Sequence, residues 1–153
     1  MFKRIFIVIL CLLVSARVCL AEGMNAEAIS KAFPKSYSGT YVWANSGDTW
    51  DASVSFATAK VLDDGTVELS GTEHFVSRAD PSQTYDSNVR AIINALTLRI
   101  EMEEIYLEKK EGFVPMVYRG NISSDLKNID TAWIGPKGEK VRLTLKAIAT
   151  KRA

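Results

Sequence analysis

The sequence predicts a mainly β protein, an eight-stranded antiparallel meander barrel that follows a short N-terminal helix. From Ser38 onward apolar and polar residues alternate with a period of two, which is typical of strands with one buried face. Short clusters of Asp, Asn, Ser, Pro and Gly separate the alternating segments and indicate tight turns. Sequential hairpin-connected strands bury their edges best by closing into a barrel. A two-sheet β-sandwich is the alternative fold that the alternation also allows.

The first residues are typical of an export signal. Lys3 and Arg4 precede the apolar run 5–14, and Cys19-Leu20-Ala21 offers small residues where a signal peptidase cleaves. The run has about ten residues, whereas a membrane-spanning helix needs roughly 20. We therefore expect residues 1–21 to be a signal peptide, a periplasmic or extracellular location, and no stable membrane span after cleavage. An uncleaved anchor is the alternative.

Composition narrows the classes of function. Both cysteines, Cys11 and Cys19, lie in the expected signal, so the mature chain would have no disulfide and no thiolate chemistry. The whole chain has 19 basic and 18 acidic residues, and residues 1–21 contain three of the basic and none of the acidic ones. The remaining 16 basic and 18 acidic residues give a formal charge of about −2. A nearly neutral chain gives no electrostatic basis for binding nucleic acid.

Residues 22–37 are predicted to form a short helix and a lead-in to the first strand. Asn25 is a plausible N-cap, Ile29 and Phe33 lie four residues apart on one face, and Pro34 ends the helix. Residues 38–149 then form a single β-barrel domain, and 150–153 a tail. The first three strands are assigned to residues 38–45, 51–62 and 66–77.

The middle of the chain is the most ambiguous part. Asp63-Asp64-Gly65 closes a clear hairpin, and residues 79–87 are predicted to be a surface loop because Asp, Pro and Ser favour turns. Residues 88–110 fit either a helix or two strands. We favour strands at 88–93 and 96–104, because a hairpin between them keeps the meander unbroken.

Three further strands complete the barrel. Pro115 restricts the start of the first of them to an edge or a bulge, since proline donates no ladder hydrogen bond. Turns at Ser123-Ser124-Asp125 and Gly135-Pro136-Lys137-Gly138 separate the three. They are assigned to residues 113–122, 129–133 and 141–147.

A signal, a short helix and an eight-stranded meander together resemble the arrangement of the lipocalins and the wider calycin group. Gly39-Thr40-Tyr41 at the start of the first strand resembles their Gly-x-Trp site. In lipocalins that Trp packs under a basic residue of the final strands at the closed end of the barrel. The resemblance makes Tyr41 the equivalent position and Arg142 the basic candidate, with Trp43 two residues further on. It implies a barrel that binds a small ligand. The chain departs from lipocalins in lacking a disulfide and in its shorter length.

Few residues suggest catalysis. His74 is the only histidine and falls on the polar side of its strand, and no metal motif, phosphate loop or nucleophile elbow is present in the sequence. We therefore expect no catalytic residue, no metal site and no cofactor. Glu73 and Glu104 both fall on the apolar side of strands. They are either the carboxylate pair that a glycosidase needs or polar contacts inside a ligand cavity.

The favoured function is an exported, non-catalytic barrel that binds a small apolar or amphipathic ligand. Core packing is the ordinary role of its many aromatic residues, yet several suit a cavity wall. A protein-binding or inhibitor module, which uses loops such as 79–87 or the barrel exterior, is the alternative function, and a hydrolytic enzyme is the third. The predicted ligand-binding residues are Tyr41, Trp43, Phe56, Glu73, Tyr118 and Trp133.

Overall fold

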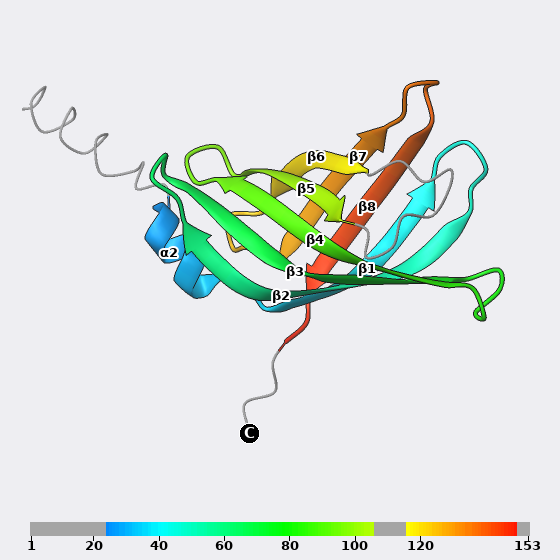
Figure 1. Cartoon of the computed structure of the whole chain (residues 1–153), viewed down its shortest axis with the longest axis horizontal. Coiled ribbons are helices and arrows are strands. Elements are labelled where there is room, and N and C mark those ends of the chain that lie inside the picture. The colour runs from blue at the N-terminus through cyan, green and yellow to red at the C-terminus, as the bar shows by residue number, and fades with distance from the viewer. Residues whose placement is uncertain (1–23, 106–115, 150–153) are drawn as a thin grey trace, which may run out of the picture.

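A computed structural model describes residues 24–105 and 116–149. It shows one closed barrel in which each strand pairs antiparallel with the next and the last pairs with the first (Figure 1). The strands are β1 (Ser36–Trp43), β2 (Thr49–Val61), β3 (Thr66–Ser77), β4 (Thr84–Asn94), β5 (Arg99–Ile105), β6 (Val117–Ile122), β7 (Asn128–Ile134) and β8 (Lys140–Ala147). The predicted eight-stranded meander barrel is confirmed, and the sandwich is excluded.

The predicted short helix is confirmed as α2 (Ala26–Ala32). The Asn25 side chain caps it by accepting a hydrogen bond of 2.8 Å from the Ala28 amide. Ile29 is fully buried, and Phe33 ends the helix in an extended conformation before Pro34. The helix packs against β2 and β3 and so covers one end of the barrel. Among residues 24–105 and 116–149, no helix is long and apolar enough to cross a membrane.

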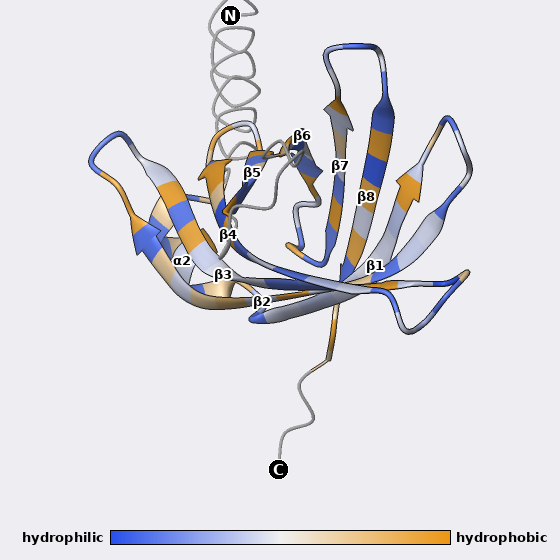
Figure 2. Cartoon of the chain, turned by 45° about the vertical axis from the view of Figure 1, so that its right-hand side comes forward, coloured by the Kyte–Doolittle hydropathy of each residue, from blue (hydrophilic) through white to orange (hydrophobic). Residues whose placement is uncertain are grey.

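Alternation along the strands separates the interior from the surface, as the bands along β3 and β8 show (Figure 2). In β8, Val141, Leu143 and Leu145 are buried while Arg142 and Thr144 are exposed. The predicted limits of β3 match those observed, and the other strands differ by a few residues at their ends. Residues 113–115 of the sixth predicted strand lie outside the described residues.

The predicted loop 79–87 is wrong at its second half. β4 begins at Thr84, so the turn between β3 and β4 spans only 78–83. Tyr85 pairs with Phe75, and Ser87 pairs with Glu73 on β3. Cross-strand contacts of this kind outweigh the turn preference of Asp and Ser, because propensity in a sheet depends mainly on packing against neighbours.

The predicted strand 96–104 is wrong at its first three residues, because the turn is longer than a two-residue hairpin. Asn94 accepts hydrogen bonds from the amides of Leu96 and Thr97 and holds a turn over 95–98. Leu96 is 91% exposed, and Leu98 adopts a positive φ of 55°. Residues 88–105 thus form two strands joined by this turn, as favoured, and not a helix; 106–110 lie outside the described residues.

β2 and β3 are the longest strands and bend together. The register shifts between Phe56 and Thr58, which marks a bulge. Opposite this bulge, a Cβ added to Gly71 would lie 1.9 Å from the Ser55 carbonyl oxygen, so a larger residue would force the strands apart.

The barrel has two structurally different ends, a helix end and an open end. The helix end carries α2 and the turns 62–65, 95–98 and 123–127. The open end carries the turns 44–48, 78–83 and 135–139. β1 runs from the helix end to the open end, with Tyr37 near its start and Trp43 at its finish.

Candidate functional site

A cavity of about 470 Å³ lies at the open end. Its walls come from the parts of β1 to β5 nearest that end, from the turn before β4 and from the residue that precedes β6. The lining residues are Tyr41, Trp43, Trp50, Phe75, Ser82, Gln83, Thr84, Tyr85, Glu104 and Met116. Half of them are aromatic, a composition that suits an apolar or flat ligand.

The aromatic rings form a continuous wall. The Tyr41 and Phe75 ring centroids lie 5.2 Å apart, and Phe75 stacks on Tyr85 at 5.9 Å. Trp43 meets the edge of Tyr41 at 6.0 Å and, on its other side, the edge of Trp133 at 6.1 Å. These separations are typical of favourable aromatic pairs, so each ring is held in place by a neighbour.

Two carboxyl groups lie at the inner side of this wall. Glu104 lines the cavity and is 4% exposed; Glu73 is 1% exposed and does not belong to the lining. The Tyr118 hydroxyl donates a hydrogen bond of 2.5 Å to Glu104 Oε1, and the Ser87 hydroxyl donates one of 3.0 Å to Glu73 Oε2. Glu73 Oε1 has no hydrogen-bond partner among the described residues.

Burial raises the pKa values of Glu73 and Tyr118. Desolvation, assisted by the charge of Glu104, raises the pKa of Glu73 to about 8, and the Ser87 hydrogen bond opposes that rise. Desolvation, followed by the Glu104 charge, also raises the pKa of the Tyr118 hydroxyl. Glu73 is therefore mainly protonated at neutral pH. None of the described residues that line the cavity is a Lys or an Arg.

The structure brings together four of the six predicted site residues. Tyr41 and Trp43 line the cavity, while Glu73 and Tyr118 lie behind Glu104. Trp133 contacts Trp43 but does not line the cavity.

Phe56 lies at the helix end, where its ring packs on Phe33 and Tyr37 at 5.5 and 6.1 Å. It is 5% exposed and belongs to the core under α2. Strand alternation places Phe56 inside the barrel but gives no information about which end it occupies.

Several lining residues were not predicted. Thr84 and Tyr85 fall within the predicted loop 79–87, whereas the structure places both in β4. Trp50 is also absent from the predicted ligand-binding residues; it pairs with Tyr41 across β1 and β2, so its place follows from the register. Glu104 was identified from strand parity, which proves correct.

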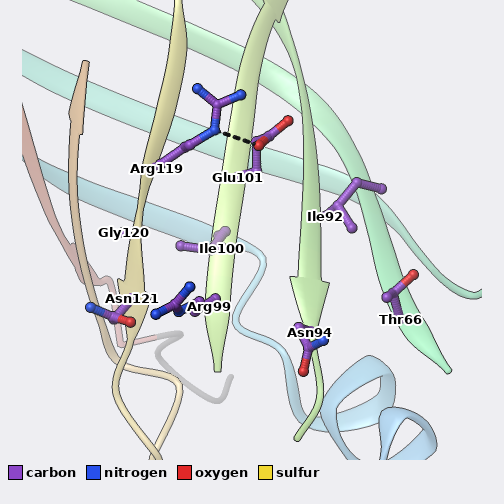
Figure 3. A pocket seen from close by; sticks show the side chains of 9 residues that line it. All are labelled: Thr66, Ile92, Asn94, Arg99, Ile100, Glu101, Arg119, Gly120 and Asn121. Carbon is purple, nitrogen blue, oxygen red and sulfur yellow. Dashed lines mark hydrogen bonds and ion pairs between the residues drawn. The ribbon is translucent and has the colours of Figure 1, made fainter. Parts of the chain in front are cut away.

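A second hollow, of about 670 Å³, lies on the outside of the barrel towards the helix end (Figure 3). It is lined by Thr66, Ile92, Asn94, Arg99, Ile100, Glu101, Arg119, Gly120 and Asn121. Arg119 and Glu101 form an ion pair of 2.8 Å across β5 and β6, and both side chains are more than half exposed. This ion pair is thus hydrated, in contrast to the buried carboxyl groups of Glu73 and Glu104.

His74 lies on the outside of β3, as strand parity predicts. Its side chain is 47% exposed, and Nδ1 lies 2.7 Å from Asp86 Oδ1. Within the described part of the chain, no three His, Cys, Asp or Glu side chains lie close enough to hold a metal ion.

Comparison with known proteins finds no matching family model, no matching curated protein and no matching solved structure. The detail expected of lipocalins is also different here. Arg142 is on the outer face of β8, where it forms an ion pair of 2.7 Å with Asp130, whereas Tyr41 points into the barrel. The likeness to lipocalins is therefore confined to the eight-stranded antiparallel barrel.

Proposed function

We propose that this chain is an exported, non-catalytic barrel that binds a small apolar or amphipathic molecule in the cavity at its open end. One observation carries the proposal: five of the ten residues that line the cavity of about 470 Å³ are aromatic, and four are polar. Its size lies within the roughly 300–1,000 Å³ typical of small-molecule sites. Export rests on the signal-like residues 1–21.

The polar groups support an amphipathic ligand rather than a purely apolar one. Burying a carboxyl group without full hydrogen bonding costs free energy, so an unneeded one would readily be replaced by an apolar residue. Glu104 borders the cavity and Glu73 lies just behind it, which provides a polar floor beneath apolar walls. A lipocalin-like mode of ligand capture, in the mouth of a barrel, fits this arrangement.

The two alternative functions, a hydrolytic enzyme and a protein-binding module, have less support. A hydrolase would need both carboxyl groups to reach its substrate, but Glu73 is 1% exposed and does not line the cavity. A protein partner has one feature in its favour, the hollow of about 670 Å³ across β4, β5 and β6 (Figure 3). No aromatic side chain lines that hollow, whereas aromatic residues commonly anchor a protein partner.

Binding of N-phenylnaphthylamine, a neutral fluorescent dye, tests the proposal. We expect its fluorescence to rise with the parent protein and to rise much less with Trp50→Ala, which removes a cavity wall. Trp133→Ala is the matched control, because Trp133 lies at the same end without lining the cavity. No dye binding to the parent, or equal loss in the two variants, would contradict a ligand site in this cavity.

Native mass spectrometry of the purified chain gives a second, dye-independent reading. A small molecule that copurifies with the parent and is lost from Trp50→Ala would support the proposal. A copurified molecule retained by Trp50→Ala would place its site elsewhere and contradict it.

A further inference from the structure

We propose that the ligand is an aromatic molecule whose flat ring lies against Trp50 and completes the aromatic wall of the cavity. A saturated ring or a straight alkyl chain then binds less tightly, although either is at least as apolar. This inference rests on the proposed function of the cavity and specifies the chemical class of its occupant.

The first support is the kind of apolar residue that lines the cavity. Five aromatic side chains and Met116 make up the apolar lining, with no Leu, Ile, Val or Ala among the described residues. Elsewhere the interior is mainly aliphatic, with Leu69, Ile93 and Leu143 fully buried. Contacts between two rings add to the free energy that burial of apolar area supplies, whereas an alkyl chain gains from the area alone. The lining therefore favours a ligand that has a ring of its own.

The second support is Trp50, which takes part in none of the ring pairs of the described residues. Each of the other four aromatic lining residues has at least one ring neighbour. Trp50 and Tyr41 are direct neighbours across β1 and β2, so their side chains leave the sheet on the same face. Both line the cavity instead of pairing, and Trp50 is only partly buried. A flat ring bound in the cavity would cover more of Trp50 and supply the ring neighbour that it lacks.

The third support is that the other rings of the wall are already held in place. Tyr41 has Trp43 at 6.0 Å and Phe75 at 5.2 Å as ring neighbours. Phe75 in turn stacks on Tyr85, with an angle of 25° between the two ring planes. Aromatic side chains have few rotatable bonds, so such a wall loses little conformational entropy when a ligand binds. A preformed wall favours a rigid, flat ligand over an alkyl chain, which loses its own rotamer freedom on binding.

Three polar lining residues indicate where a substituent of the ligand would lie. Ser82, Gln83 and Thr84 are consecutive and exposed, at the end of the turn 78–83 and the start of β4. They therefore belong to the rim of the cavity, and their side chains are uncharged. A hydroxyl or amide group on the ring would stay hydrated at this rim while the ring itself lies among the aromatic side chains.

Two neutral alcohols that differ only in their ring test the inference by calorimetry. Phenylbutanol has a flat aromatic ring, and cyclohexylbutanol has a saturated ring that is at least as apolar. We expect phenylbutanol to bind the parent about fivefold more tightly, because only its ring can stack. Equal binding, or tighter binding of cyclohexylbutanol, is the result that burial of apolar area alone would give. It would overturn the inference while the proposed function of the cavity stands.

Substitutions at Trp50 assign the preference to that ring. Trp50→Leu keeps an apolar side chain without a ring and should reduce the preference for phenylbutanol to about twofold or less, whereas Trp50→Phe should retain most of it. Trp133→Leu is the matched control and should keep the parental preference, because Trp133 lies at the same end without lining the cavity. An unchanged preference in Trp50→Leu would overturn the inference. If circular dichroism shows that Trp50→Leu fails to fold, Tyr85→Leu serves the same purpose.

The indole N–H signals of the three tryptophans, Trp43, Trp50 and Trp133, provide a readout of ring contact by NMR. An aromatic ring shifts nearby proton signals through its ring current, which a saturated ring does not have. At equal saturation we expect the Trp50 signal to move more with phenylbutanol than with cyclohexylbutanol; equal shifts would overturn the inference. Should neither alcohol nor N-phenylnaphthylamine bind the parent, the inference and the proposed function both fail. Dye binding without a preference for phenylbutanol overturns only the inference.

Discussion

The two ends of the barrel are built from the same eight strands, but the interior is packed at the helix end and contains a cavity at the open end. At the helix end, Phe33, Tyr37 and Phe56 pack ring against ring. The buried Tyr37 hydroxyl donates a hydrogen bond of 2.5 Å to the Leu126 carbonyl, so its polar atom is satisfied. At the open end, aromatic rings surround a cavity, and Glu73 Oε1 has no partner in the described part of the chain.

The difference suggests separate roles for the two ends, with the helix end stabilising the fold and the open end forming the cavity. α2 places Ile29 and Phe33 over the helix end, which provides a packed core without relying on the mouth of the barrel. The open end can then hold buried carboxyl groups that reduce stability. Sites that bind ligands are commonly less stable than the structure that supports them.

The largest effect is expected at the helix end. Phe56→Ala removes a ring that packs on two others, and should lower the free energy of unfolding by about 3–5 kcal/mol. Trp133→Ala at the open end should cost less, since that side chain is only partly buried. Urea denaturation compares the two variants. A smaller loss for Phe56→Ala than for Trp133→Ala would contradict the division between the ends.

The next effect is a pH dependence that comes from Glu73. Its pKa is raised in the folded state from 4.5 to about 8, so the folded protein retains a proton that the unfolded chain loses. This carboxyl group should therefore lower stability progressively as pH rises across that interval, by an amount on the order of a few kcal/mol.

Glu73→Leu should remove that part of the pH dependence and be at least as stable as the parent at pH 8. It should also weaken capture of N-phenylnaphthylamine, if Glu73 supports the polar floor of the cavity. Urea denaturation at several pH values, with fluorescence of the bound dye, measures both. The burial of Glu73 would not be unfavourable if the variant were less stable than the parent at pH 8. The same holds if its free energy of unfolding changed with pH as steeply as that of the parent.

A smaller loss is expected for Tyr118→Phe. The variant keeps the buried ring but removes the hydroxyl that donates to Glu104 Oε1. Hydrogen bonds to charged groups contribute roughly 1.5–3 kcal/mol, so thermal melts should show a loss of about that size. Tyr37→Phe is the control at the helix end, where the acceptor is a neutral carbonyl, and should cost about 1 kcal/mol. The reverse order would contradict the assignment of charge to the open end.

The smallest effect is expected on the outer hollow. Glu101→Gln breaks the ion pair with Arg119, in which both side chains are largely exposed. Exposed pairs contribute about 0–1 kcal/mol, so stability should change little, and dye binding should be unchanged. Reduced dye binding in this variant would move the ligand site from the cavity to the outer face.

Much of the fold follows from alternation and turn chemistry. β3 was predicted with its observed limits, because Asp63-Asp64-Gly65 fixes one end and the alternation continues without a break. The same parity identified Glu73 and Glu104 as inward-facing. It failed at 95–98, where Asn94 holds a longer turn than a two-residue hairpin.

The site was harder to predict, because parity shows which side of a strand faces inward but not how far along the barrel a side chain lies. That height depends on the stagger between strands, a property of the closed barrel as a whole. Phe56 and Tyr41 both face inward, yet Phe56 lies under α2 and Tyr41 lines the cavity. Tyr85 was missed because its local sequence favours a turn.

Two-dimensional amide NMR of the parent, titrated with phenylbutanol, is the most direct test of the claim that the open end holds the ligand. The neutral probe makes this test independent of the charge of the ligand. We predict that amide shifts change at Trp43, Trp50 and Tyr85, which line the cavity, and remain constant at Ile29 and in the strand near Phe56. Changes confined to the helix end or to the outer hollow, with none in the cavity, would contradict it.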